Sequence, residues 1–528
     1  MAQAKYKPLS FTTTLRNPER MPSFLKCLIP FEGKTLTKDV IHNVVKSVIR
    51  EKIYKPMGIG RNEIFNAIWK DEEITFSDAQ LEQIIIENPQ NHKEYGFDKG
   101  WDSRFDTWYK IFKELGFANY NMNERIVITQ TGHMLVDAYS ETSSNYVKVQ
   151  RVYLNALMKY QTNNPLRKIL NEQSPLSLLL RVIKLFHEDP EENDAGVARH
   201  ELPILICWTD NDANAVYQYI KQIRRERQFN CSDEYIYEHC LSILHTNNRN
   251  YIKMEKICHE TIDEYIRKMR MTGLISLRGN GRFVDINKFE EAAAEYVIEN
   301  YSTYEKYNTI DSFIAYMGQI DSHILEIEEV DEEELTDARQ RKLKECASSM
   351  TKEYIYNELR NVCSKKESKD KVLRFIPAPT RLEFLTSISL VQNFNTLDVR
   401  PNYPVDDEGY PVSTATGGLA DIECFDSDYD SYYEVSLMCG RSDQVNNEVI
   451  PISRHLQEAI QNRRTESFAV FIAPSIHQDT YEACDWQKYK NHVDIIPYSM
   501  DDFIKALSLY SKATQLLNKS NYGSSCVK

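Results

Sequence analysis

The chain has 528 residues, of which 42% are hydrophobic and 27% are charged, and its formal net charge is −14. This composition is ordinary for a globular protein and favours roughly three or four domains. The acidic balance argues against a protein that coats nucleic acid through bulk charge, but it leaves room for a local basic groove. No apolar run of about 18 residues predicts a membrane helix, and the polar start lacks the apolar core of a signal peptide, so we expect a cytoplasmic protein. The 11 cysteines are scattered without CxxC spacing, which indicates reduced thiols.

Two segments in the N-terminal half share one pattern, a helix followed by a β-hairpin. In the first, an apolar helical period over 103–115 ends at Gly116, and strands at 117–121 and 125–130 lead into a helix from Thr131.

The second segment begins with a helix over 256–272 that ends at Gly273. Strands at 274–278 and 282–286 then flank an Asn280-Gly281 turn, which is a strong hairpin signal. This order predicts winged-helix-like units, and two unrelated helix–hairpin corners remain the alternative interpretation.

The next 70 residues, 301–370, change character. They are strongly acidic between Glu326 and Glu334 and then read as charged helix, ending in SKKESKD, which carries no apolar residue. We predict a helical linker with a boundary near residue 370.

The remaining residues, 371–528, predict a mixed sheet flanked by helices. The predicted order is a helix entered through Pro379, an acidic hairpin, an amphipathic helix, two strands and a closing helix capped by Ser499. The hairpin strands are expected at 420–425 and 432–439, the helix at 445–463, the next strands at 468–474 and 493–499, and the last helix at 499–517.

The acidic hairpin carries candidate chemistry. Because side chains alternate along adjacent strands, Asp421 and Glu434 are expected to meet on one face, with the carbonyl of Val435 nearby. Such an all-oxygen set suits Mg²⁺, which can activate water for phosphodiester hydrolysis. Solvated acidic residues without a site role are the alternative interpretation.

Several stretches, taken in chain order, resemble the AlwI/BstNBI group of type IIS restriction and nicking endonucleases, whose catalytic domain has the PD-(D/E)xK nuclease fold. They are TLRNPERMPSFLKCLIPFEGK, PLSLLLRVIKLF, YIRKMRMTGLISLRGNGRFVD, GGLADIE, YYEVS, VIPISRHL, FAVFIAPSIHQDTYEA and IIPYSMDDF. The series spans nearly the full length. The middle stretches are unspecific singly, so the resemblance depends on the whole series.

The resemblance implies an α+β multidomain protein. It implies mostly helical, winged-helix-like DNA-recognition subdomains at 1–160 and 161–300, a helical linker at 301–370, and a C-terminal α/β PD-(D/E)xK nuclease domain at 371–528.

The resemblance also implies a site. Its acidic constellation falls on Glu383, Asp421, Glu434 and Glu448, with Asp421, Glu434 and the Val435 carbonyl as the Mg²⁺ ligands. Glu383 has a competing interpretation as a capping-box partner of Thr380, and Glu448 as an exposed helix residue.

Ser436 stands where many such sites carry a lysine. We expect Glu448, rather than Arg441, to take over the lysine's work, and His455 to help hold the fold.

Basic residues near the recognition segments are expected to contact DNA phosphates, although an exposed helix face is the ordinary fate of any one of them. These candidates are Arg16, Arg20, Lys221, Arg224, Arg225, Lys268, Arg278 and Arg282.

The resemblance implies a type IIS endonuclease that binds a short asymmetric site in double-stranded DNA and, with Mg²⁺, cuts at a fixed offset outside it. A strand-specific nicking enzyme or the large subunit of a heterodimer is the alternative within this class. A transient homodimer through the nuclease domain, or a smaller nuclease subunit, would supply a second active site. A catalytically silent DNA-binding protein is the alternative from another class, and the Asp421/Glu434 pair argues against it.

Overall fold

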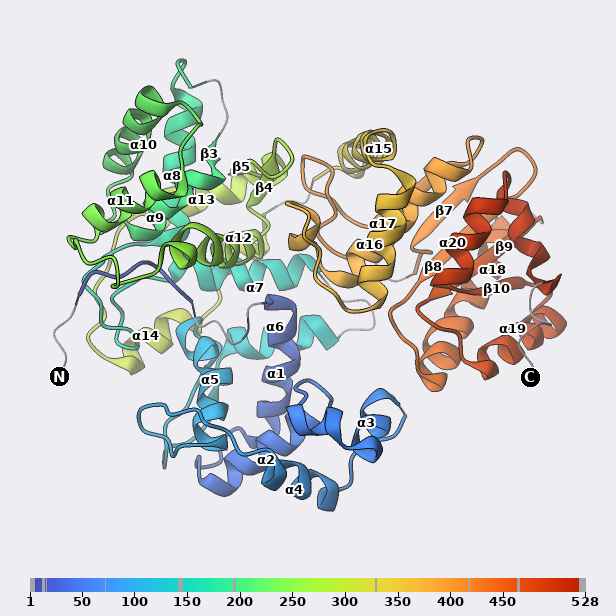
Figure 1. The fold of residues 1–528 in the computed structure, drawn as a ribbon, viewed down its shortest axis with the longest axis horizontal. Coiled ribbons are helices and arrows are strands. Elements are labelled where there is room, and N and C mark those ends of the chain that lie inside the picture. The colour runs from blue at the N-terminus through green and yellow to red at the C-terminus, as the bar shows by residue number, and fades with distance from the viewer. Residues whose placement is uncertain are drawn as a thin grey trace. The chain divides into compact units, whose positions relative to one another are not determined.

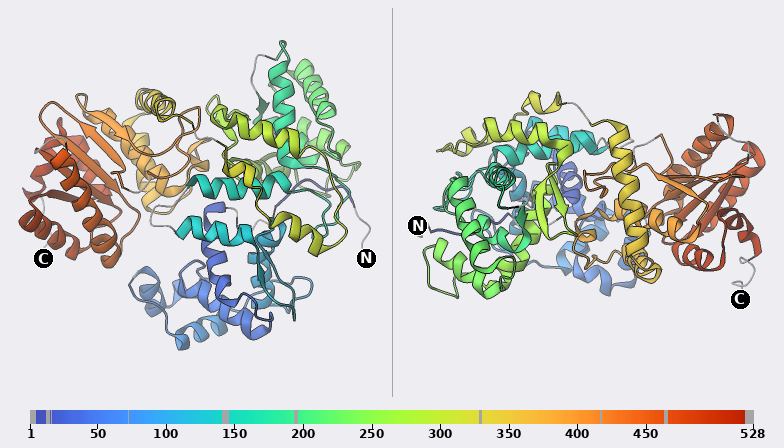
Figure 2. Two further views of the ribbon diagram at one scale, coloured as in Figure 1. Left: turned by 180° about the vertical axis from the view of Figure 1, so that it is seen from behind. Right: turned by 90° about the horizontal axis from the view of Figure 1, so that it is seen from above.

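The computed structural model describes residues 5–11, 15, 17–71, 73–140, 146–192, 196–327, 330–415, 418–462 and 466–521. They form two compact units (Figures 1 and 2). The first unit comprises Met1–Glu63, Phe76–Glu141 and Asn145–Glu329, and the second comprises Ile64–Thr75, Thr142–Ser144 and Val330–Lys528.

The first unit is mostly helical. Its α-helices are α1 (Met21–Leu28), α2 (Lys38–Arg50), α4 (Asp78–Glu87), α5 (Trp101–Glu114), α6 (Gln130–Ser140), α7 (Tyr146–Lys159), α8 (Pro175–Glu188), α9 (Leu202–Cys207), α10 (Ala213–Arg227), α11 (Asp233–Ile243), α12 (Thr261–Arg270), α13 (Glu291–Asn300) and α14 (Ile310–Met317). Its strands are β1 (Ala118–Asn119), β2 (Val127–Ile128), β3 (Val197–Ala198), β4 (Ile275–Arg278) and β5 (Phe283–Ile286). Helix α3 (Glu63–Lys70) lies almost wholly in the range of the second unit.

Both predicted helix–hairpin segments are confirmed, with shorter strands in the first. Helix α5 is followed by Gly116 at φ +77°, and β1 pairs antiparallel with β2 over two residues only. Helix α12 is followed by Gly273, and β4 pairs antiparallel with β5 across the predicted turn. The start of the second helix is a π-helical turn, Lys256–Glu260, rather than α-helix. Strand β3, which was not predicted, adds a third strand beside β5.

The second unit is built on a mixed five-stranded sheet in the order β10-β9-β8-β7-β6. Its strands are β6 (Asp398–Pro401), β7 (Ile422–Phe425), β8 (Asp430–Val435), β9 (Ser467–Ala473) and β10 (Asp494–Ser499). The two pairs among β6, β7 and β8 are antiparallel, and the two pairs among β8, β9 and β10 are parallel. Its helices are α15 (Glu332–Ser349), α16 (Lys352–Cys363), α17 (Ala378–Asn393), a π-helix η10 (Asp443–Val449), α18 (Ile450–Asn462), α19 (Gln478–Asn491) and α20 (Met500–Leu509).

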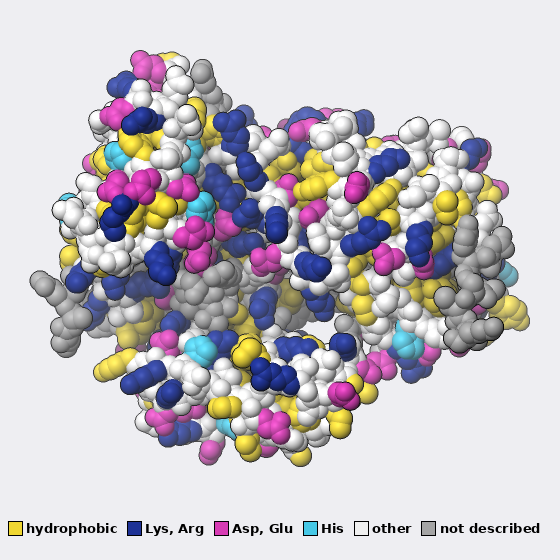
Figure 3. All heavy atoms as spheres, in the orientation of Figure 1, with side chains coloured by type: hydrophobic (Ala, Val, Ile, Leu, Met, Phe, Trp, Pro, Cys, Tyr) yellow, Lys and Arg dark blue, Asp and Glu magenta, His cyan; other side chains and the backbone are white. Residues whose placement is uncertain are grey.

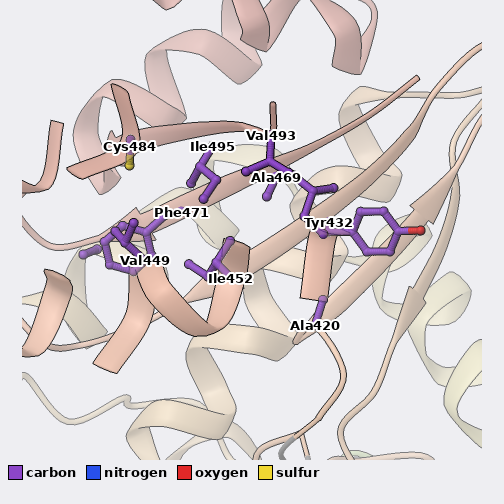
Figure 4. Packing of buried hydrophobic residues seen from close by; sticks show 11 residues of the cluster. Ala420, Tyr432, Val449, Ile452, Ala469, Phe471, Cys484, Val493 and Ile495 are labelled. Atoms are coloured by element: carbon purple, nitrogen blue, oxygen red, sulfur yellow. The ribbon is translucent and has the colours of Figure 1, made fainter. Parts of the chain in front are cut away.

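Helices cover both faces of this sheet. On one face, Val449 and Ile452 of the η10–α18 region pack against Tyr432 of β8 and Phe471 of β9, as Figure 4 shows. The ring of Tyr433, the next residue along β8, instead meets Phe503 of α20. This alternation buries a strand on both faces and explains the continuous apolar run of β9.

The sequence missed two elements of this unit. Strands β9 and β10 are parallel, so the chain needs a crossover between them, and α19 is that crossover. Strand β6 forms the edge beside β7, where α15 covers it: Arg339 Nη1 donates to the Pro401 carbonyl at 2.7 Å and Gln340 Nε2 to the Val399 carbonyl at 2.9 Å. Residues 330–370 are therefore part of the second compact unit.

The predicted capping box at Thr380 and Glu383 is wrong. Helix α17 begins at Ala378. Its N-cap position is Pro377, so no side chain caps the helix. Thr380 and Glu383 both lie inside the helix and are buried. The Ser499 cap, in contrast, is confirmed, because its Oγ accepts the backbone N–H of Asp502.

Candidate active site

The hairpin of β7 and β8 brings Asp421 and Glu434 together. The register pairs Ile422 with Tyr433, so Asp421, one residue before β7, stands opposite Glu434. The Val435 N–H donates to Asp421 Oδ2 at 2.8 Å, and the Asp421 N–H donates to Glu434 Oε2 at 3.4 Å. Each carboxylate is thus held by the backbone of the other strand.

Both hairpin strands are shorter than predicted. Strand β8 ends at Val435, although Ser436 N–H still donates to the Ile472 carbonyl at 2.9 Å. The chain then turns, because the Ser436 Oγ accepts the Met438 N–H at 3.1 Å. Ser436 therefore lies at the end of the strand rather than inside it.

Two further carboxyl groups reach the same place from helices on different segments of the chain. Glu383, on α17, is 3% exposed, and its Oε2 accepts the Ala415 N–H at 2.9 Å. Glu448, on η10, lies near enough to the Ser436 side chain for that hydroxyl to lower the pKa of its carboxyl group. The structure thus gathers all four predicted acidic residues around the end of β8.

Burial and mutual repulsion raise the pKa of every carboxyl group in this cluster. Burial raises the pKa of Glu434 to about 8, and nearby Glu448 adds to the rise. Burial raises the pKa of Glu448 to about 7, with further repulsion from Asp421. The pKa of Asp421 and that of Glu383 both lie well above their ordinary range, because each is buried beside another carboxyl group. Within the described part of the chain, no Lys or Arg forms an ion pair with these four residues.

His455 also belongs to this place. It lies on α18, and its Nδ1 is 3.3 Å from Glu434 Oε1. Its Nε2 is buried without a hydrogen-bond partner among the described residues, and burial lowers its pKa, which favours the neutral imidazole. From the sequence we expected His455 only to help hold the fold. The one signal of a site role was its position seven residues, or about two helical turns, beyond Glu448, since a helix brings residues i and i+7 to one face.

Arg441 is engaged elsewhere. Its exposed side chain pairs with Asp479 of α19 and, with Asp443 and Asn446, lines a cavity of about 660 Å³. This pairing supports the expectation that Arg441 does not replace the missing lysine.

The donor chemistry of the cluster suits a hard cation. Its members offer carboxylate oxygens and the carbonyl at the end of β8. No Lys or Arg side chain of the described chain pairs with these carboxylates to reduce their mutual repulsion. In the present side-chain arrangement, however, no three His, Cys, Asp or Glu residues of the described chain converge closely enough to enclose a metal ion.

Three of the predicted DNA-contacting residues are buried inside the first unit. Arg224 is 5% exposed, donates to Glu201 Oε2 at 2.7 Å and to Glu192 Oε2 at 2.7 Å, and lies over the Phe186 ring. Lys221 pairs with Asp189 and Glu191. Lys268 is 1% exposed. These cations balance internal charges or lie in the core, so they do not present themselves to a DNA backbone.

The other basic candidates have mixed environments. Arg225 is 65% exposed and 3.3 Å from Glu191, and Arg282 is exposed at the tip of the β4–β5 hairpin. Arg278 pairs with Asp285 at 2.5 Å, and Arg20 donates to the Ile53 carbonyl at 2.5 Å. Arg16 lies outside the described residues. Figure 3 shows Lys and Arg side chains gathered over the region where Figure 1 draws β3, β4 and β5.

Comparison with known proteins places the chain among restriction endonucleases, which are site-specific nucleases. The AlwI restriction endonuclease family matches residues 113–345 and 319–506. The chain therefore belongs to the AlwI restriction endonuclease family, as its sequence indicated.

Solved structures of restriction endonucleases are also similar. The small subunit of the heterodimeric restriction endonuclease R.BspD6I is 24% identical, with 29% of this chain and 76% of that chain covered and a TM-score of 0.25. The restriction endonuclease FokI is 11% identical over 98% of both chains with a TM-score of 0.26, and FokI bound to DNA gives a TM-score of 0.27, with 11% identity over 98% of this chain and 99% of that chain. No curated protein matches the chain. Within the described residues, no helix is both long and apolar enough to cross a lipid bilayer.

Proposed function

We propose that this protein is a type IIS restriction endonuclease that binds a short asymmetric DNA site and hydrolyses phosphodiester bonds at a fixed offset outside it with Mg²⁺. The observation that carries the proposal is the group of buried and half-buried carboxyl side chains around the end of β8, with which no Lys or Arg of the described chain forms an ion pair. Membership of a restriction endonuclease family gives that group a substrate, the phosphodiester bond.

In this proposal Asp421, Glu434 and the Val435 carbonyl hold the metal ion. Bound Mg²⁺ supplies a water of lowered pKa and stabilises negative charge on the scissile phosphate. Glu383 completes the acidic site from α17, and Glu448 orients the attacking water. Neutral His455, next to Glu434, is placed to accept a proton within the same site.

DNA recognition is assigned to the first unit. Its helix–hairpin segments serve as winged-helix-like readers, with subdomains at 1–160 and 161–300. Among the basic candidates, Arg16, Arg20, Arg225, Arg278 and Arg282 remain for phosphate contacts. The excess of negative charge elsewhere keeps such contacts local.

We assign one active site to each chain, so cutting both strands requires a second site. A transient homodimer through the nuclease domain, or a smaller nuclease subunit, supplies it. Without such a partner the enzyme nicks one strand.

The test is Asp421→Asn in the full-length protein, with Asp428→Asn as the matched control. Asp428 is exposed in the turn of the same hairpin. We expect Asp421→Asn to slow single-turnover cleavage of a plasmid on the order of 10²-fold or more and to leave DNA affinity within a few fold, because base readout does not depend on the cleavage site. Asp428→Asn should cut normally. A folded Asp421→Asn protein that cuts at the wild-type rate, or that loses binding as well, would refute the assignment.

A further inference from the structure

One buried side-chain amide, that of Gln444, joins the segment that follows β8 to the segment that follows β9 through hydrogen bonds. Gln444, on η10, is 0% exposed. Its Nε2 donates to the Met438 carbonyl at 2.9 Å and to the Ser475 carbonyl at 2.8 Å. Its Oε1 accepts the His477 N–H at 2.9 Å and the Thr480 hydroxyl at 2.8 Å. All four hydrogen-bonding positions of the side chain are therefore used.

These four bonds join η10 to the turn after β8 and to the chain that runs from β9 into α19, at one end of the sheet. Met438 lies in the turn after β8, Ser475 and His477 follow β9, and Thr480 lies in the first turn of α19. The backbone of Gln444 adds a fifth bond, from its N–H to the Gly440 carbonyl at 3.0 Å. The turn 436–440 is thus fixed to the helix that carries Glu448.

Glu448 lies four residues beyond Gln444 on the same π-helix, and the Ser436 hydroxyl, at the start of that turn, is near enough to lower the pKa of the Glu448 carboxyl group. A π-helix is rare and occurs often at functional sites. The bonds of Gln444 therefore tie the 436–440 turn, which begins at Ser436, to the π-helix that carries Glu448.

We propose that Gln444 is a positioning residue that sets the place of the Glu448 carboxyl group relative to Glu434. The inference rests on the proposed function, because it names a second residue on which the geometry of that same site depends. Its physical basis is that a fully satisfied buried amide fixes its partners in one arrangement, whereas a half-satisfied one does not.

The primary variant is Gln444→Glu, which keeps the volume and the acceptor oxygen that takes the bonds from His477 and Thr480 but loses the donors to Met438 and Ser475. Gln444→Met, which removes all four bonds, is the second variant. The matched control is Gln392→Met. Gln392, on α17, has an Nε2 that also donates to two backbone carbonyls, of Ala347 in the last turn of α15 at 3.0 Å and of Met350 directly after that helix at 2.7 Å.

Three quantities are measured in the full-length proteins: the single-turnover cleavage rate at saturating Mg²⁺, the DNA dissociation constant in Ca²⁺, and Mn²⁺ binding followed by electron paramagnetic resonance. Loss of a group that orients active-site ligands costs about 10- to 100-fold in activity or metal affinity. We expect a loss of that size in cleavage and in Mn²⁺ affinity for Gln444→Glu, unchanged DNA affinity, and wild-type values for Gln392→Met. A folded Gln444→Glu protein with wild-type cleavage and Mn²⁺ binding would overturn the proposal.

A double variant shows whether Gln444 acts through Glu448. If it does, Gln444→Glu added to Glu448→Ala lowers the cleavage rate no further than Glu448→Ala alone. A full additional loss in the double variant would show that Gln444 acts by another route. If the wild-type protein itself fails to cut DNA, the proposed function fails, whereas wild-type cleavage with an unaffected Gln444→Glu protein defeats this inference alone.

Discussion

At the scale of residues, the fold holds acidic side chains close together in the site although their negative charges repel one another. Four carboxyl groups lie near one another, those of Glu383 and Glu434 buried and those of Asp421 and Glu448 half-buried. The backbone N–H groups of Val435, Asp421 and Ala415 are their main compensation. The first unit treats its buried charges differently, because Arg224 is matched by Glu201 and Glu192. An acidic group left without such partners stabilises the fold poorly and suits an added cation.

This unrelieved repulsion predicts how stability depends on pH. The pKa of Glu448 is about 7 in the folded protein, whereas a free glutamate has a pKa of about 4.3. Between these values the folded state binds more protons than the unfolded state, so the contribution of Glu448 to stability falls as pH rises. Glu448→Gln removes that loss. We expect this substitution to raise the unfolding midpoint of the metal-free protein by a few degrees at pH 8 and by less at pH 5.

The measurement is thermal unfolding in EDTA at the two pH values. Glu458→Gln, an exposed residue on α18, is the control and should change neither midpoint. An equal effect of Glu448→Gln at both pH values would mean that the carboxyl group of Glu448 is not held protonated in the fold.

At the scale of elements, the features that depend on local sequence patterns were predicted better than those that depend on long-range packing. The alternation along β7 and β8 correctly placed Asp421 opposite Glu434, because the hairpin register follows from neighbouring residues. The crossover helix α19 was missed because its sequence, QDTYEACDWQKYKN, has no apolar stripe: Trp486 and Tyr489 are exposed and only Thr480 and Cys484 are buried.

The environment of a side chain was the least predictable feature. Nothing local shows that Arg224 is buried against Glu201, which is 23 residues away in sequence, or that His455 meets Glu434. Likewise, the Thr380–Glu383 spacing fits a capping box, but Pro377 and the packing of α17 set the helix start elsewhere. Such contacts depend on tertiary packing, which spacing alone does not encode.

The cover of edge strand β6 by α15 depends on a close approach at Gly409. This residue has φ +82°, and a Cβ added to it would lie 2.2 Å from the Ala338 carbonyl oxygen on α15. Gly409→Ala should therefore cost the backbone penalty of about 1–2 kcal/mol and, in addition, about 1–3 kcal/mol from displacing α15. The comparison is Gly418→Ala, where φ is +106° and no atom lies within 4 Å of the added Cβ.

Chemical denaturation of the full-length variants, followed by a signal from the second unit, measures this difference. We expect Gly409→Ala to unfold at clearly lower denaturant than Gly418→Ala. Equal destabilisation would show that the contact between Gly409 and α15 contributes nothing beyond the backbone strain.

At the scale of the whole molecule, an acidic protein must bind an acidic polymer. The net charge of −14 opposes DNA at long range, so specific binding has to come from local cations. Each cation that neutralises a phosphate releases counterions, with a slope of about −0.9 in log K against log salt. The salt dependence therefore counts the phosphate contacts directly.

Arg282 is the exposed candidate at the β4–β5 hairpin tip. In an Asp421→Asn background, which prevents cleavage, Arg282→Ala should weaken binding to specific and non-specific duplexes alike and reduce the slope by about 1. Lys505→Ala, which removes a 73% exposed cation on α20 of the second unit, should leave the slope unchanged. A loss confined to one base position would show that Arg282 reads a base instead.

The measurement that tests the account most directly is run-off sequencing of both strands of plasmids cleaved by the full-length protein with Mg²⁺. The account predicts that every cut lies at one fixed distance from a single asymmetric sequence, on one strand or on both, and that Asp421→Asn slows these cuts on the order of 10²-fold or more. Cuts inside a palindromic sequence, cuts with no shared neighbouring sequence, or the same cuts made by Asp421→Asn at the wild-type rate would contradict it.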